Sequence, residues 1–156
     1  MTAGQNAAQQ AVEQAIRGMY RAFIEHRPRD IEAALHEDCT IWDVFTPQLI
    51  RGRAERDRFH EADQAQSQAR GPLTLSVDAP VVSVWGDVAV ARYYLDFRYE
   101  PPNAVAGRVR ITSVLRLLDG TWRIVHHHEG LVPEGVPPIS GTAESGLESG
   151  AIAASS

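Results

Sequence analysis

The sequence lacks the features that mark several large classes of protein. It has one cysteine, Cys39, so no internal disulfide can form, as is usual in a reducing compartment. No stretch approaches the ~18–20 consecutive apolar residues of a membrane span. The N-terminus has neither the basic start nor the apolar run of a signal peptide. We therefore expect a cytoplasmic protein with no membrane partner.

Positive charge and cofactor motifs are also scarce. The 156 residues include 15 Lys and Arg against 20 Asp and Glu, a net charge of -5, which argues against a nucleic-acid surface. There is no glycine-rich phosphate loop and no G-x-S-x-G elbow, and Cys39 has no evident base beside it. We expect no cofactor and no nucleic-acid partner.

Periodicity predicts helices first and strands afterwards. Apolar residues recur at helical spacing over 8–26, a short second helix follows Pro28, and a charged third helix covers 51–65, with its charges on a solvated face. From Leu73 the period changes to two and predicts four strands: Leu73–Val84, Asp87–Tyr99, Ala106–Leu118 and Thr121–Glu129. The order favours an α+β fold with helices on one face of an antiparallel sheet.

The predicted domain is bounded by polar, low-complexity ends. Residues 1–7 are small and polar and are expected to be flexible, so the domain covers 8–131. Residues 132–156 are rich in Gly, Pro, Ser, Ala and Glu without apolar periodicity, which predicts a disordered tail.

The last predicted strand carries three consecutive histidines in W-R-I-V-H-H-H-E-G. Because alternate side chains on a strand point to opposite faces, His126 and His128 share one face and His127 lies on the other with Glu129. No cysteine pair or H-x-x-x-H helix spacing accompanies the histidines. We therefore predict no metal site.

Three segments resemble the SnoaL-like branch of the NTF2-like superfamily. I-R-G-M-Y-R-A-F followed by R-D-I-E-A-A-L-H-E-D-C-T-I-W-D looks like its opening helices and first strand. R-G-R-A-E-R-D-R-F resembles its third helix, with Arg56 at a usually apolar position. L-D-G-T-W-R-I-V-H-H-H-E-G is similar to its terminal strand, and also to that of the association domain of calcium/calmodulin-dependent kinase II. The resemblance implies a cystatin-like cone in which helices and a curved sheet enclose one pocket.

The ketosteroid isomerase branch of this superfamily implies roles for individual residues. Asp43 matches its proton-shuttling base, and Tyr20 matches the tyrosine that donates to the enolate oxygen. Phe59 and His60 match a Phe-Tyr pair, so His60 is expected to hydrogen-bond the Tyr20 hydroxyl. Ser113 stands where that branch has a second oxyanion donor, an Asp, and a hydroxyl is a weaker donor.

Strand parity then separates an inner from an outer sheet face. With Ser113 pointing inward, the predicted inner face also carries Ala89, Ala91, Tyr93, Leu95, Ile111, Leu115, Val125, His127 and Glu129. The predicted outer face carries Arg92, Tyr94, Arg110, Thr112, Arg116, Trp122, His126 and His128. The resemblance implies a homodimer formed through that outer face, since a Trp with two histidines suits an amphipathic contact.

These residues predict a cofactor-independent acid–base isomerase, dehydratase or cyclase for an apolar carbonyl compound. Asp43 would be the base, Tyr20 the oxyanion donor, and His127 with Glu129 a second acid–base pair. A structural alternative stays open for each residue: Asp43 caps the turn at Thr46-Pro47, Tyr20 is a core aromatic, and His127 pairs with Glu129 without chemistry. The alternative function is a non-catalytic ligand-binding or oligomerisation domain.

Overall fold

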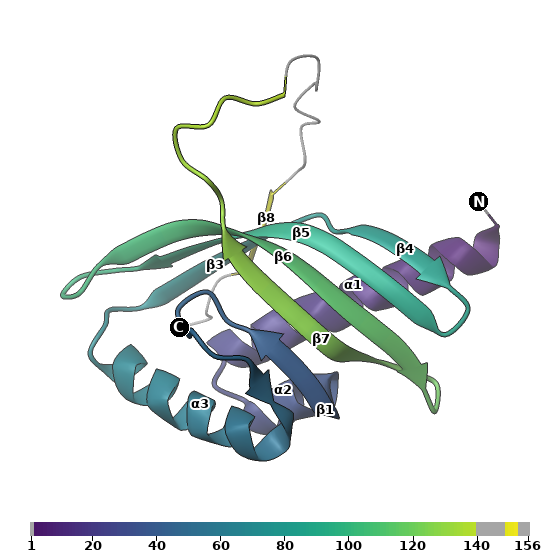
Figure 1. The fold of residues 1–156 in the computed structure, drawn as a ribbon, viewed down its shortest axis with the longest axis horizontal. Helices are drawn as coiled ribbons and strands as arrows, with labels where there is room; N and C mark the ends of the chain where they lie inside the picture. The colour runs from purple at the N-terminus through teal and green to yellow at the C-terminus, as the bar shows by residue number, and fades with distance from the viewer. Residues whose placement is uncertain (1, 140–148, 153–156) are drawn as a thin grey trace.

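The computed structural model describes residues 2–139 and 149–152, in which three helices cover one face of a curved sheet (Figure 1). The helices are α1 (Ala3–Ile24), α2 (Pro28–Ala34) and α3 (Gly52–Gln68). The strands are β1 (Leu35–Trp42), β2 (Ile50–Arg51), β3 (Leu73–Asp78), β4 (Val81–Trp85), β5 (Val88–Tyr99), β6 (Val105–Leu118), β7 (Thr121–Leu131) and β8 (Ser149–Ile152). The predicted α+β class is confirmed.

Helix α1 begins earlier than its apolar spacing predicted. The Thr2 side chain accepts a hydrogen bond from the Gln5 N–H, and the Gln5 side chain accepts one from the Thr2 N–H. This capping box satisfies free donors of the first turn. The helix therefore starts at Ala3 and not near Ala8, so the predicted flexible segment is helical from Ala3 onward.

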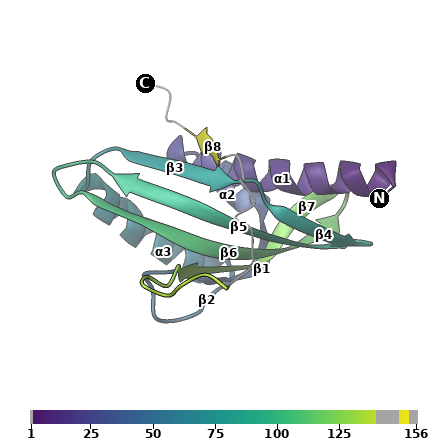
Figure 2. The same ribbon diagram turned by 90° about the horizontal axis from the view of Figure 1, so that it is seen from above.

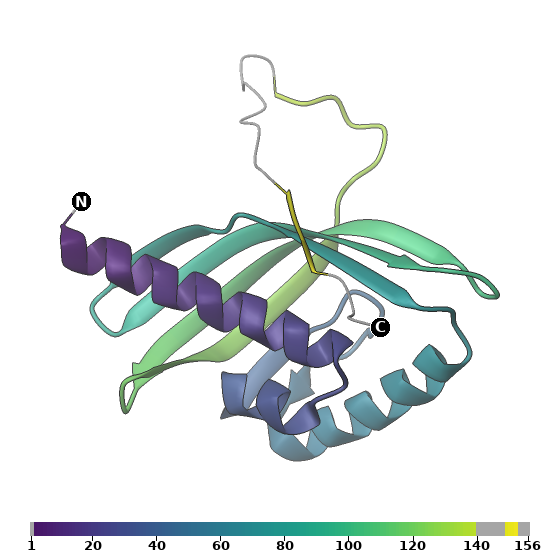
Figure 3. The same cartoon turned by 180° about the vertical axis from the view of Figure 1, so that it is seen from behind.

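The sheet has the order β2-β1-β7-β6-β5-β3-β8, with β4 also paired to β5. All pairs are antiparallel except β1 with β7, so the sheet is mixed and not wholly antiparallel as predicted. Figure 2 shows α1 along the edge that carries β3 and β4, and Figure 3 shows α2 and α3 gathered at one end of the sheet. The space between these helices and the concave sheet face holds the core.

The predicted strand over Leu73–Val84 is divided in two. Pro80 has no N–H for a ladder hydrogen bond, and the strand is interrupted at Ala79-Pro80, between β3 and β4. β3 then pairs with the Leu95–Tyr99 half of β5, while β4 pairs with the Val88–Arg92 half.

A bulge in β7 changes which side chains face the core. Val114 pairs with His126, but the next residue of β6, Leu115, pairs with Ile124, so Val125 is an extra residue in the ladder. Side-chain parity reverses across such a bulge. Trp122 and Ile124 are therefore buried on the same side as His127. The prediction that Trp122 faces outward and Val125 inward is wrong.

Part of the predicted tail has secondary structure. Ser149–Ile152 forms β8, which pairs antiparallel with Leu75–Asp78 of β3. The prediction of disorder therefore does not hold for these four residues, while residues 140–148 and 153–156 lie outside the described part of the chain. In the residues described, no helix is both long and apolar enough to cross a membrane.

Candidate active site

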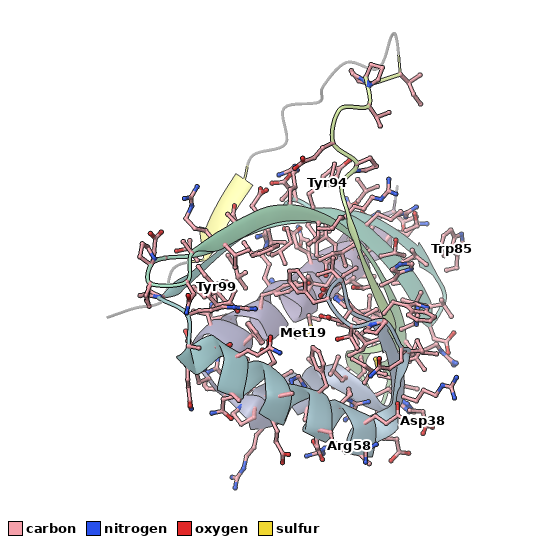
Figure 4. All side chains as sticks on the ribbon, turned by 60° about the vertical axis from the view of Figure 1, so that its left-hand side comes forward. Met19, Asp38, Arg58, Trp85, Tyr94 and Tyr99 are labelled. Atoms are coloured by element: carbon pink, nitrogen blue, oxygen red, sulfur yellow. The ribbon has the colours of Figure 1, made fainter. Side chains whose placement is uncertain are left out.

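The largest set of apolar and ionisable side chains meets in a cavity of about 160 Å³ between the helices and the concave sheet face. Its apolar walls come from α1, α3 and the sheet and include Met19, Phe23, Phe59, Leu75 and Leu95. Figure 4 shows Met19 under the sheet, with Tyr94 on the opposite side. The polar residues in the lining are Tyr20, Asp43, His60, Asp63, Arg70, Tyr99, His127 and Glu129.

A chain of hydrogen bonds runs behind this cavity. The Tyr20 hydroxyl lies 3.1 Å from that of Tyr93, and the Tyr93 hydroxyl lies 3.2 Å from the Ser113 hydroxyl. Ser113 Oγ lies 2.9 Å from His127 Nδ1, and His127 Nε2 lies 3.0 Å from Glu129 Oε1. Tyr20, Tyr93, Ser113 and His127 are all buried.

The fold explains how these five side chains meet. Ser113 and His127 lie directly opposite each other on β6 and β7, and Glu129 is two residues beyond His127 on the same face. Tyr20 reaches Tyr93 from α1, and their rings pack edge to face at 6.2 Å. Burial raises the pKa of both phenols, that of Tyr20 well above its usual value, so both stay protonated donors near neutral pH.

Asp43 caps the turn after β1 and also lines the cavity. Its Oδ2 accepts hydrogen bonds from the Phe45 N–H at 2.8 Å and from the Thr46 hydroxyl at 3.0 Å, so it does cap the turn after β1. The same carboxyl lines the cavity. Burial, followed by the negative charge of Glu129, raises the pKa of Asp43 above 3.8 despite these two hydrogen bonds.

His60 does not hydrogen-bond Tyr20, contrary to prediction, and the Tyr20 hydroxyl bonds that of Tyr93 instead. Within the described part of the chain, His60 Nε2 is buried without a hydrogen-bond partner, and it lies 3.8 Å from the Glu32 carboxylate. Burial lowers the pKa of His60, which favours the neutral imidazole. It lines the cavity as an unused acceptor or donor.

The other predicted binding residues divide into three groups. Phe59 and Leu95 line the cavity. Tyr93, Ile111, Ser113 and Leu115 point into the same interior but are buried and do not line it. Val125 is half-buried, does not line the cavity, and is the bulge residue, so its predicted place in the binding surface is wrong.

A wider hollow lies on the outer sheet face. It has a volume of about 430 Å³, and Arg92, Tyr94, Arg110 and His128 contribute to its lining. Its one carboxyl, Asp78, is ion-paired with Arg108 at 2.6 Å. The described residues that line this hollow include no buried carboxyl–histidine pair, so the inner cavity is the better candidate for chemistry. Contact between two copies through the outer face stays a prediction, and Trp122 does not contribute to it.

Comparison with known protein families identifies the family of this chain. Residues 12–133 match the sequence model of the SnoaL-like domain. The chain belongs to the SnoaL-like domain family. The resemblance found in the sequence is thereby confirmed. A search of curated proteins gives no match.

Solved structures with the NTF2-like, cystatin-like fold resemble this SnoaL-like domain. A candidate dehydratase from Streptomyces avermitilis aligns with TM-score 0.71 and 18% identity over 82% of this chain and 98% of that chain. A candidate ketosteroid isomerase from Shewanella frigidimarina gives 0.64 and 18% over 75% and 92%. A candidate calcium/calmodulin-dependent kinase II association domain from Xanthomonas campestris gives 0.63 and 18% over 77% and 85%. At such identities the likeness shows the fold alone.

Two charged residues of the SnoaL-like domain's cavity were missed from the sequence. Asp63 lies one turn after His60 on α3, a spacing that puts both on one helix face. Burial, with the charge of Glu129 adding to it, raises the pKa of Asp63, while Arg70 lowers it. Arg70 lies over the Tyr99 ring at 4.7 Å. Asp63 was missed because it lies in the charged run 51–65, which was read as a solvated face, and Arg70 lies beyond that run, where no motif marked it.

The cavity continues into a second hollow, the outer hollow, which is distinct from the hollow on the outer sheet face. The hollow has a volume of about 340 Å³ and lies against the ends of α1 and α3. It shares with the cavity the residues Phe23, Ile31, His60, Asp63, Arg70, Leu73 and Tyr99. A molecule entering from this side passes His60, Asp63 and Arg70 before it reaches Tyr20 and Glu129.

Proposed function

We propose that this SnoaL-like domain is a cofactor-independent acid–base enzyme that isomerises, dehydrates or cyclises a neutral carbonyl compound. The observation that supports this most is the meeting of a phenol donor, Tyr20, with the carboxyls of Asp43 and Glu129 in one apolar cavity. Enclosure strengthens each electrostatic interaction with the bound compound.

In the proposed reaction Asp43 takes a proton from the carbon next to the carbonyl. The electron pair of the broken C–H bond forms a C=C bond, and the carbonyl π pair moves to oxygen. The Tyr20 hydroxyl lies in the lining to donate to that oxygen. The pKa of Asp43, raised by burial, brings this base nearer to neutral pH, where general acid–base catalysis is most effective.

The cavity size indicates a small substrate. Its 160 Å³ is close to the ~150 Å³ of an engineered apolar cavity that binds benzene. One ring therefore fills the inner cavity, and any longer substituent extends into the outer hollow past His60. Three carboxyls, those of Asp43, Asp63 and Glu129, line the cavity against one arginine, Arg70, which disfavours a carboxylate substrate.

Exchange of α-hydrogens for deuterium tests this function without a known substrate. Wild-type protein in D2O is mixed with cyclohexanone or 2-cyclohexen-1-one, and loss of the α-proton signal is followed by NMR. We expect catalysed exchange that falls about 10²–10⁴-fold in Asp43→Asn. The control is Asp38→Asn, an exposed carboxyl on β1, the strand that precedes Asp43, and outside the cavity, which should exchange like wild type.

Exchange no faster than in buffer would contradict the proposal. Ketone binding without exchange would favour the non-catalytic ligand-binding alternative.

A further inference from the structure

The hydrogen-bonded chain from Tyr20 to Glu129 starts and ends on the same cavity. Tyr20 lines the cavity at one end, and His127 and Glu129 line it at the other. The two middle residues, Tyr93 and Ser113, lie behind the lining, and Ser113 is fully buried. Water is thus kept from the middle of the chain, while both ends can meet one bound molecule.

Every member of the chain can both give and accept a proton. The three hydroxyls each carry one donor hydrogen and accepting lone pairs, and imidazole carries a donor on one nitrogen and an acceptor on the other. The chain therefore has two directions. With a proton on Glu129, all donors point toward Tyr20, whose own hydrogen is then free to face the cavity. In the opposite direction that hydrogen is held by Tyr93.

We propose that this chain is a proton relay that connects Glu129 to Tyr20, so that Tyr20 gives a whole proton to the substrate oxygen and is refilled from Glu129. The proposal rests on the proposed function, which it extends from a stabilised enolate to a neutral enol. Tyr93 and Ser113 become relay residues that never touch the substrate.

The step balances as follows. Asp43 takes the carbon proton, and the substrate oxygen takes the proton of Tyr20. Tyr20 regains a proton from Tyr93, Tyr93 regains one from Ser113, and Ser113 regains one from Nδ1 of His127. His127 receives the Glu129 carboxyl proton at Nε2, which leaves Glu129 as a carboxylate. When Asp43 returns its proton to another carbon, the enol proton goes back along the same chain.

The step requires that the two carboxyls hold one proton between them at the beginning and at the end. Both carboxyls line the same cavity, and burial, followed by the charge of Glu129, raises the pKa of Asp43. Like charges that share a site disfavour double ionisation. The net negative charge passes from Asp43 to Glu129 and does not stay on the substrate, which lies in a largely apolar cavity.

A purely structural network would also satisfy these buried hydroxyls, so the test must separate the two roles. Ser113→Ala cuts the chain at its middle, and Tyr93→Phe cuts it nearer Tyr20 without changing the ring. The matched control is Thr40→Val, because the Thr40 hydroxyl makes the same kind of bond, 2.7 Å to His126 Nδ1, outside the chain.

In the cyclohexanone exchange assay we expect Ser113→Ala and Tyr93→Phe to lower kcat about tenfold or more with little change in KM. Thr40→Val should behave as wild type. Because the relay acts only through Tyr20, adding Ser113→Ala to Tyr20→Phe should cost no further activity. If wild type exchanges and Ser113→Ala matches Thr40→Val, the relay is wrong while the proposed function stands.

A second measurement needs no turnover. The imidazole 15N signals of His127 report which nitrogen carries the proton. We expect Tyr20→Phe to shift these signals in the wild-type and Thr40→Val backgrounds, and to leave them in place in the Ser113→Ala background. If Tyr20→Phe leaves these signals unchanged in all three backgrounds, the relay is wrong, even if the α-hydrogens of the ketones are exchanged.

Discussion

Asp43 combines a structural and a chemical property in one side chain. Two donors hold its Oδ2 in the turn after β1, and burial with the charge of Glu129 raises its pKa above 3.8. A raised folded-state pKa means that the charged form is less favoured in the fold than in the unfolded chain. Protonated Asp43 therefore makes its full contribution to the stability of the fold below pH 3.8. That contribution is lost as the pH rises through the folded-state pKa of Asp43.

The sign of this linkage gives a prediction for Asp43→Asn. At pH 7 the variant should be more stable than wild type, since the amide removes a disfavoured charge while its oxygen can still accept from Phe45. The melting temperature should rise by a few degrees, roughly 2–4 °C. This gain should shrink toward pH 4, where wild-type Asp43 is increasingly protonated. Thermal unfolding of wild type and Asp43→Asn, monitored by circular dichroism at both pH values, measures this difference. A variant less stable than wild type at pH 7 would contradict a raised pKa of Asp43.

Individual residues also mark what the sequence could not reveal. Tyr20 and Asp43 were assigned by resemblance, and both line one cavity. The partner of Tyr20 was misassigned to His60, because sequence places residues on faces but does not fix which of two nearby groups a side chain reaches. The Ser113–His127 contact is readable only once the β6–β7 register is known.

Among the elements, α3 departs most from its sequence pattern. Its charge run was read as a solvated face, yet Arg56 is fully buried. The Arg56 guanidinium bonds Glu32 of α2 at 2.9 Å and the carbonyls of Glu37 and Cys39 at 3.1 and 3.2 Å. One side chain thus joins α3 to α2 and β1, and so holds the wall that carries Phe59 and His60.

Removing this arginine should weaken the fold strongly. We expect Arg56→Ala to lower the free energy of unfolding by about 3–5 kcal/mol, because the largely buried Glu32 carboxylate then keeps only the exposed Arg53, at 3.3 Å, as its arginine partner among the described residues. The double variant Arg56→Met/Glu32→Met should recover most of that loss, since no charge is then buried. Arg58→Ala, an exposed position on the same helix (Figure 4), is the control. Urea unfolding measures all three, and equal stability of the two single variants would contradict this role.

Strand boundaries and parity were predictable only in part. The alternation of β5 and β6 follows from a period of two, and their inner residues were identified correctly. The bulge at Val125 could not be foreseen: without it, either Trp122, Ile124 and His126 or Arg123, Val125 and His127 share the inner face, and nothing in the local sequence marks the extra residue. It moves Trp122 into the core, although Trp122 had been expected to make a homodimer contact on the outer face.

At the scale of the whole molecule, the cone leaves a small inner cavity joined to a larger outer hollow. Sequence order and motifs were enough to predict the cone, since the helices and the long strands each have clear periods. The cavity volume depends on how side chains from α1, α3 and the sheet interlock, which no local pattern encodes.

The cavity volume predicts selection by size. A single-ring ketone present at 100 times its Kd should raise the melting temperature by about 5–10 °C, whereas a four-ring steroid enone should give no shift. Leu95→Phe should abolish the shift by filling the cavity. Tyr94→Phe, the next residue on β5 but on the outer face (Figure 4), should leave it unchanged. A shift with the steroid and none with the ring would contradict the proposed substrate size.

The pH dependence of cyclohexanone α-hydrogen exchange, in wild type and Asp43→Asn, tests the central claim most directly. The base acts in its ionised form, so the wild-type rate should rise with pH along a limb whose midpoint lies above 3.8, the direction in which burial moves the pKa of Asp43. In Asp43→Asn this limb should vanish together with most of the rate. The same limb and the same rate in both proteins would contradict the assignment of Asp43 as the base of this cavity.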